Sequence, residues 1–100
     1  MNVRIEEIDG NMVAILEGSL DTAAAPETEK AMSPLNDVKD KDIIFDCKGL
    51  EYISSAGLRI FLTILQSAED NGVQVYISNV NYNVRSIFDI TGFSNIFKFK

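Results

Sequence analysis

The chain has 100 residues, of which 46% are hydrophobic, and it carries a formal net charge of −6. This length and composition suit one packed domain, which we place at residues 1–100. The negative charge argues against direct binding to nucleic acid or to anionic membranes, because both depend on clusters of Lys and Arg that this chain lacks.

Composition also argues against catalysis and against a metal site. The chain has no histidine, so a Ser-His-Asp or Cys-His nucleophile cannot be assembled, and zinc would lack its usual nitrogen ligands. A Ser-Lys pair is not excluded by composition, although no Gly-x-Ser-x-Gly elbow or phosphate-binding loop surrounds the serines. We therefore expect a binding protein rather than an enzyme, without a metal or a cofactor.

The cysteine content and the hydropathy pattern bear on location. Cys47 is the single cysteine, so no intramolecular disulfide can form, and a reducing compartment is expected. No apolar run approaches the ~20 residues of a membrane span, and the first residues lack the basic-then-apolar plan of a signal peptide. These features predict a cytoplasmic protein that does not insert into a membrane.

The first twenty residues are predicted to form a β-hairpin. Residues 3–6 alternate between apolar and polar side chains with period two, and residues 12–16 form a second apolar run. Between them, Asp9-Gly10 is typical of a type I′ hairpin turn. Two antiparallel strands should therefore open the chain.

A helix is expected over residues 21–32, which are rich in Ala and Glu. Asp21 or Thr22 can cap its first backbone amides, and Pro26 is tolerable only in the first turn. Pro34 should end or distort this helix, because the residue before a proline is pushed out of the helical region.

The middle of the chain changes from a strand to a helix. Residues 43–45 form a short β-branched and aromatic run bounded by Asp42 and Asp46, which favours a buried strand. The period then becomes helical, so residues 54–57 are predicted to form the first turn of a long amphipathic helix. Its apolar stripe consists of Leu58, Phe61, Leu62, Leu65 and Ala68, and its polar stripe of Arg59, Thr63, Gln66 and Asp70.

The start of this helix is a candidate site. The backbone N–H groups of a first helical turn have no intrahelical partner, and the macrodipole places partial positive charge there. An oxygen of Ser54 or Ser55 can cap these groups, and a phosphate can be held on them. Spacing alone leaves both interpretations open.

Two aspartates adjoin predicted strand ends, where ligands gather in open α/β sheets. Asp21 follows the second strand of the hairpin, and Asp46 follows the central strand. Asp21 is interpreted either as a helix cap or as part of a site. For Asp46 we favour a turn residue that accepts hydrogen bonds from local backbone N–H groups.

The C-terminal third continues the alternation of strands and helices. Asn71-Gly72 is a left-handed helix stop, residues 73–77 read as a strand, and residues 83–91 as a helix that stops at Gly92. Residues 93–99 are apolar, and the pattern does not assign their type. A hairpin followed by strand-helix repeats predicts an α/β fold, in which helices pack on a mixed sheet through right-handed crossovers.

Three segments together resemble one known family. Residues 50–59, Leu-Glu-Tyr-Ile-Ser-Ser-Ala-Gly-Leu-Arg, resemble the signature of the STAS-domain family, the anti-sigma factor antagonists of bacteria, in which a serine before a Gly-Leu pair is phosphorylated. Residues 18–22, Gly-Ser-Leu-Asp-Thr, and residues 87–93, Ile-Phe-Asp-Ile-Thr-Gly-Phe, resemble two further motifs of the family, in the same order. The resemblance covers nearly the whole chain and implies the same compact α/β architecture.

The resemblance also implies which serine is modified. In the family pattern Asp-Ser-(Ser or Thr)-Gly-Leu, the residue that corresponds to the phosphorylated serine is Ser55, counted back from Gly57. Ser54 stands where the family often has aspartate, and Ala56 where it has a second hydroxyl, so Ser54 remains a rival acceptor. The implied partner-binding residues are Asp21, Ser54, Ser55, Ala56, Gly57 and Arg59.

The function that the resemblance implies is partner switching. The unphosphorylated form would bind an anti-sigma factor that has serine kinase activity and thereby release a sigma factor for transcription. This kinase would phosphorylate the acceptor serine with ATP, and a serine phosphatase would reset the switch. Two alternatives remain open: a STAS scaffold subunit of a transporter or sensory complex that is never phosphorylated, and a nucleotide-binding module that uses the same helix start.

Overall fold

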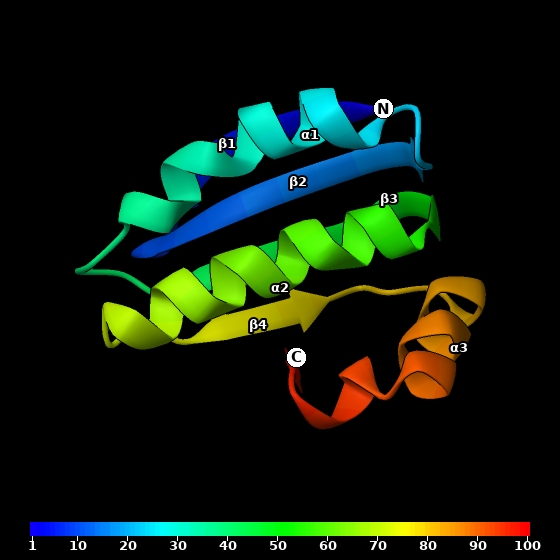
Figure 1. Cartoon of the computed structure of the whole chain (residues 1–100). Helices are drawn as coiled ribbons and strands as arrows, with labels where there is room; N and C mark the ends of the chain where they lie inside the picture. The colour runs from blue at the N-terminus through cyan, green and yellow to red at the C-terminus, as the bar shows by residue number, and fades with distance from the viewer.

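The computed structural model describes residues 1–100, which form one sheet with helices packed on it (Figure 1). None of the helices combines the length and apolar character needed to cross a membrane. In chain order the elements are β1 (Asn2–Ile8), β2 (Asn11–Leu20), α1 (Ala25–Met32), a 3-10 helix (Ser33–Asp37), β3 (Ile43–Ile53), α2 (Ser55–Asp70), β4 (Val75–Ser78), α3 (Tyr82–Thr91), a second 3-10 helix (Phe93–Asn95) and β5 (Lys98–Phe99).

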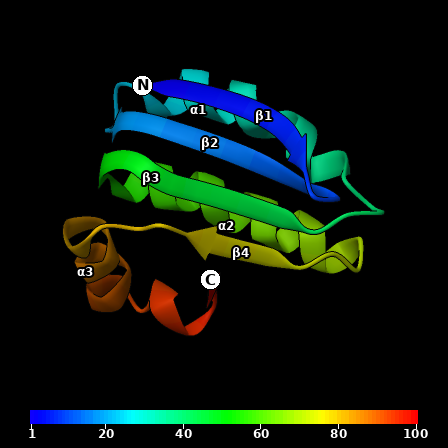
Figure 2. The same ribbon diagram turned by 180° about the vertical axis from the view of Figure 1, so that it is seen from behind.

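The five strands follow one another across the sheet in the order β1-β2-β3-β4-β5. β1 and β2 pair antiparallel, and all the other neighbours pair parallel, so the predicted mixed sheet is confirmed. Each parallel connection steps in the same direction along the sheet, so right-handed crossovers place the connecting helices on the same face. The two opposite views agree: α1 and α2 lie side by side in front of the sheet in Figure 1 and behind it in Figure 2.

The N-terminal hairpin forms as predicted. Ile8 pairs with Asn11, so the loop consists of Asp9 and Gly10. Both loop residues have positive φ, 52° for Asp9 and 81° for Gly10, which is the requirement of a type I′ turn.

The core lies between the sheet and its helices, and Phe61 of α2 is at its centre. Its ring contacts Phe45 of β3 at a centroid distance of 4.5 Å and Phe88 of α3 at 6.2 Å. In the predicted apolar stripe, Leu62 is only half-buried, whereas Ile60 and Ile64, outside the stripe, are buried. The buried side of α2 is wider than one stripe because the sheet lies behind the helix in Figure 1 and neighbouring elements flank it.

α1 begins at Ala25, four residues later than the sequence pattern predicted. Pro26 has no N–H, so it cannot make the bond to Thr22 that an earlier start would need. The proline therefore lies in the first turn, where its missing donor costs nothing. At the other end the α-helix stops at Met32 and continues as a 3-10 turn that contains Pro34.

β3 runs from Ile43 to Ile53, so the prediction that the strand ends at Phe45 was wrong. Asp46, which suggested the end of the strand, lies on the face of the sheet that no helix covers. Asp46 pairs with Ser78 of β4 in register, while Cys47 next to it is fully buried. An irregularity in the pairing with β2 follows at this point and lets the strand continue.

The later elements differ from the prediction by one or two residues, and β4 ends at Ser78, one residue later than predicted. β4 begins at Val75 and α3 at Tyr82, where the side chain of Asn81 accepts a hydrogen bond from the N–H of Val84 at 2.8 Å. The predicted helix stops are confirmed, with φ of 74° at Gly72 and 81° at Gly92. The unassigned segment 93–99 forms a 3-10 turn and the short edge strand β5.

We predict that Leu65→Ala lowers the free energy of unfolding by about 2–5 kcal/mol, because Leu65 is buried against the core and truncation leaves a cavity. Leu62→Ala, one turn away and only half-buried, is the matched control and should cost clearly less. Urea denaturation of both variants measures this difference. Equal losses would mean that α2 packs with a different face toward the sheet.

Candidate functional site

The carboxyl ends of β2 and β3 lie next to each other, and the candidate residues follow from them. Leu20 pairs with Ile53, and the N–H of Ser54 donates to the carbonyl oxygen of Leu20 at 2.8 Å. Asp21 and Ser54 therefore continue from neighbouring points at one end of the sheet, where α1 and α2 also begin (Figure 1). This is the edge at which ligands gather in open α/β sheets.

Ser54 is the N-cap of α2. It has the extended backbone typical of a cap, with φ −90° and ψ 172°, and its Oγ accepts a hydrogen bond from the N–H of Gly57 at 3.2 Å. Only 8% of the residue is exposed. The capping role that the sequence allowed to either serine therefore belongs to Ser54.

Ser55 is the first residue of α2, and its environment is different. It is exposed, and its hydroxyl has no hydrogen-bond partner within the chain. The hydroxyl stands on the first turn of a 16-residue helix, where the dipole favours negative charge. Of the two serines, Ser55 is thus the one that a second molecule can reach.

Gly57 is required by close packing. It is buried, and a Cβ at this position would lie 2.6 Å from Cγ of Leu20 and 2.9 Å from Cγ1 of Ile53. The first turn of α2 therefore rests directly on the ends of β2 and β3. Any larger side chain would push Ser54 and Ser55 away from the sheet.

The two aspartates have local structural roles. Oδ1 of the exposed Asp21 accepts a hydrogen bond from the N–H of Ala24 at 2.8 Å, so it caps the turn before α1 rather than the helix itself. Oδ1 of Asp46 accepts from the N–H of Lys48 at 3.1 Å and from Nδ2 of Asn79 at 3.2 Å. Asp46 accepts from a local backbone N–H as expected, but it lies within a strand and not in a turn, and its second partner, Asn79, is distant in sequence. Asp21 alone lies at the end of the sheet where α2 begins.

A groove between α1 and α2 extends from this end of the sheet. It includes two of the partner-binding residues that the resemblance implies, Ala56 and Arg59. The other six were not predicted, and those on α1 and α2 lie at helical spacing, so pairing the outer stripes of the two helices could have found them. They are Thr22, Ala25, Pro26, Glu29, Ile60 and Thr63.

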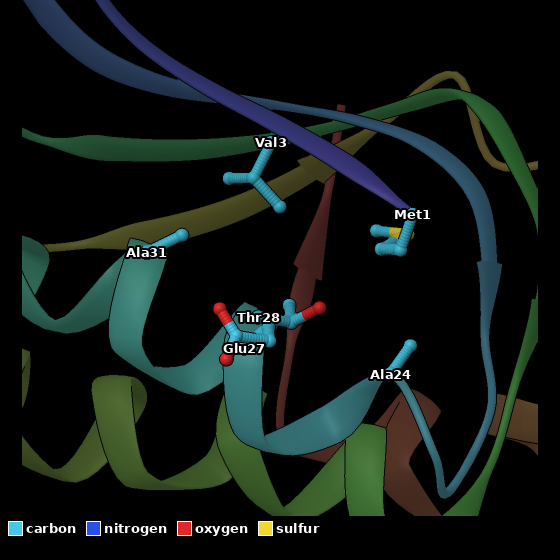
Figure 3. A pocket seen from close by; sticks show the side chains of 6 residues that line it. All are labelled: Met1, Val3, Ala24, Glu27, Thr28 and Ala31. Atoms are coloured by element: carbon cyan, nitrogen blue, oxygen red, sulfur yellow. The ribbon is translucent and has the colours of Figure 1, made fainter.

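A second hollow lies between β1 and α1 (Figure 3). Met1, which precedes β1, and Val3 of the strand face the N-cap residue Ala24 and the helix side chains Glu27, Thr28 and Ala31 across it. Glu27 carries the only charged side chain of this lining, so no set of polar side chains converges there. The groove between α1 and α2 is the better candidate for recognition.

The remaining nucleophile, Cys47, is buried and inert. Burial, and to a smaller extent the carboxylate of Asp46, raises the pKa of its thiol to about 12. A thiol is reactive as its thiolate, which this environment disfavours. Within the structure, no three His, Cys, Asp or Glu side chains gather in a way that could hold a metal ion.

Comparison with known proteins places this geometry in a family. The model of the STAS domain family matches residues 2–100. The chain belongs to the STAS domain family. Its relatives include BtrV of Bordetella bronchiseptica, named as an anti-sigma factor antagonist, which is 31% identical over 97 residues, 97% of this chain and 84% of BtrV. The anti-sigma-B factor antagonist of Staphylococcus aureus is 29% identical over 79 residues, 79% of this chain and 73% of that protein.

Solved STAS structures share the fold. The anti-sigma factor antagonist SpoIIAA in its unphosphorylated form superimposes with a TM-score of 0.80 at 20% identity, over 99% of this chain and 88% of that one. The phosphorylated form of SpoIIAA from Bacillus gives a TM-score of 0.73 at 19% identity, over 99% of this chain and 91% of that one. The predicted α/β architecture is therefore confirmed as the STAS fold.

We predict that Ser54→Ala lowers the free energy of unfolding by roughly 0.5–2 kcal/mol, because it removes the cap of α2. Ser55→Ala, one residue along the chain, is the matched control and should stay within about 0.5 kcal/mol of the wild type, since its exposed hydroxyl bonds to nothing. Urea denaturation followed by far-UV circular dichroism measures both. A larger loss for Ser55→Ala would contradict the assignment of the cap.

Proposed function

We propose that this protein is a cytoplasmic anti-sigma factor antagonist that acts by phosphorylation-controlled partner switching, with Ser55 as the acceptor. One observation carries the proposal: Ser55 presents a free, exposed hydroxyl at the helix position that the family pattern marks, while Ser54 is buried and uses its hydroxyl as a cap. The names of the relatives support the antagonist role.

In this account the unphosphorylated protein binds an anti-sigma factor, and the sigma factor is released for transcription. The binding surface is the end of the sheet where Asp21 and Ser55 lie, together with the adjoining groove at Ala56 and Arg59. Gly57, which is buried, contributes by holding the first turn of α2 against the strands. Ser54 contributes as the cap rather than through direct contact.

The anti-sigma factor is proposed to act also as the serine kinase. Oγ of Ser55 attacks the γ-phosphorus of ATP, so that an Oγ–P bond forms while the bond to the β-phosphate oxygen breaks. ADP leaves, and a base of the kinase takes the hydroxyl proton. A serine phosphatase hydrolyses the phosphoester and restores the binding form.

The phosphate works through charge and size rather than through refolding. It adds about −1.5 to −2 charge and bulky acceptor oxygens to an exposed position. The N-terminus of α2 tolerates this charge, since the helix dipole favours an anion there. A partner packed on the same turn does not, so the complex dissociates while the fold persists.

The two departures from the family pattern are compatible with this role. Ser54 replaces an aspartate, and both residue types are favoured N-caps, so the replacement keeps the cap. Ala56 removes a second hydroxyl beside the acceptor, which leaves Ser55 without a neighbouring competitor on that side. The alternative is a STAS scaffold subunit that is never phosphorylated.

We predict that incubation with ATP and the candidate anti-sigma kinase adds one phosphate to the wild type and to Ser54→Ala, but none to Ser55→Ala, as measured by intact mass. Ser55→Ala should still bind the anti-sigma factor, because it loses no packing. Ser55→Asp should bind more weakly while keeping its circular dichroism spectrum, since one carboxylate imitates a phosphate only in part.

Two results would contradict the proposal. Loss of phosphate uptake in a folded Ser54→Ala protein, with uptake kept in Ser55→Ala, would move the acceptor by one residue. No uptake in any variant, with the affinity for the anti-sigma factor the same in all of them, would replace switching with the scaffold hypothesis.

A further inference from the structure

Arg59 lies four residues after Ser55 on α2, so the two side chains are neighbours on one face of the helix. Cα–Cβ bonds in a helix tilt toward its N-terminus, so a long side chain covers the turn before its own Cα. The side chain of Arg59 can therefore reach the turn that begins with Ser55. The order is also favourable, because an acidic group four residues before a basic one is the better arrangement in a helix.

Arg59 is exposed and forms no ion pair in the unmodified protein. The groove that it lines also contains Glu29 of α1, yet no salt bridge joins the two side chains. By contrast Arg85, on α3, is held by Asp89 at 3.3 Å, four residues along the same helix. Arg59 is thus a guanidinium without a partner, one helical turn from the proposed acceptor.

We propose that Arg59 pairs in cis with the phosphate when Ser55 is modified, an inference that rests on the function proposed above. A guanidinium presents a planar fork of donors that matches phosphate oxygens and can bind two of them at once. The phosphate carries more charge than the carboxylate of Glu29, so it is the stronger partner for the arginine.

This pairing gives the modification a second consequence. In the unmodified protein the guanidinium of Arg59 is available to a partner that occupies the groove between α1 and α2. In the phosphorylated protein it is drawn toward the start of α2, and the groove is left with the carboxylate of Glu29 as its charged side chain. Phosphorylation thus removes a cation from the binding surface as well as adding an anion to it. Arg59 is a positioning residue for the switch.

The test uses protein with phosphoserine incorporated at position 55 during translation, so that no kinase is needed. The second pKa of the phosphate, about 6 in a free phosphoserine, is measured by a ³¹P NMR titration of the folded protein. Pairing with a cation lowers this pKa, because it favours the dianion. We expect Arg59→Gln to raise it by on the order of half a unit relative to the wild type.

Two further variants make the result specific. Arg59→Lys keeps the positive charge but not the planar fork of donors, and should restore part of the lowering of the phosphate pKa. Lys30→Gln removes another exposed cation, from α1, and should leave the phosphate pKa unchanged. The pairing is refuted if the wild type and Arg59→Gln give the same phosphate pKa, or if Lys30→Gln raises it as much as Arg59→Gln does.

This experiment separates the pairing from the proposed function. A kinase that modifies Ser55, together with a phosphate pKa that Arg59→Gln does not change, would overturn the pairing and leave the switch intact. A shifted phosphate pKa supports the pairing even where no kinase modifies Ser55, a result that would instead overturn the switch.

Discussion

The hydrogen bond from the N–H of Ser54 to the carbonyl oxygen of Leu20, 2.8 Å long, joins the ends of two parallel strands at the point where α2 begins. Much of the candidate site depends on it. It fixes the last residue of β3, and the absence of a side chain at Gly57 lets the first turn of α2 rest against Leu20 and Ile53. Because the first turn of α2 packs tightly against the ends of the strands, Ser54 is buried and Ser55 is exposed.

The different roles of Ser54 and Ser55 follow from this geometry. Ser54 satisfies a backbone amide that the helix cannot satisfy itself, and its burial makes it part of the fold. Ser55 is exposed, and its hydroxyl makes no hydrogen bond within the chain. A switch benefits from this separation, since modification can alter a surface without loss of stability. The same logic extends to Arg59, which is exposed and unpaired and therefore free to change partners.

Features that depend on a single residue's backbone conformation could be predicted from the sequence. The turn at Asp9-Gly10 and the stops at Gly72 and Gly92 need positive φ, which few other residue types adopt at low cost. The pattern predicts too early a start for α1 because Asp21 or Thr22 can cap a helix, whereas Asp21 caps the turn before it. The missing N–H of Pro26 prevents an earlier start of the helix, so α1 begins at Ala25.

The length of β3 and the groove were not predictable in the same way, because both depend on neighbours distant in sequence. In the sequence Asp46 suggests the end of a strand, but in the sheet it lies on the face that no helix covers, where it pairs with Ser78. The groove exists only because β2 and β3 are neighbours, which sets α1 beside α2 (Figure 2).

The decisive measurement for partner switching is the affinity of the anti-sigma factor for two forms of the protein, one with unmodified Ser55 and one with phosphoserine at position 55. Both affinities are measured by calorimetry at equal salt. Partner switching requires that phosphorylation weaken binding at least tenfold, about 1.4 kcal/mol, with an unchanged circular dichroism spectrum, and equal affinities would rule it out.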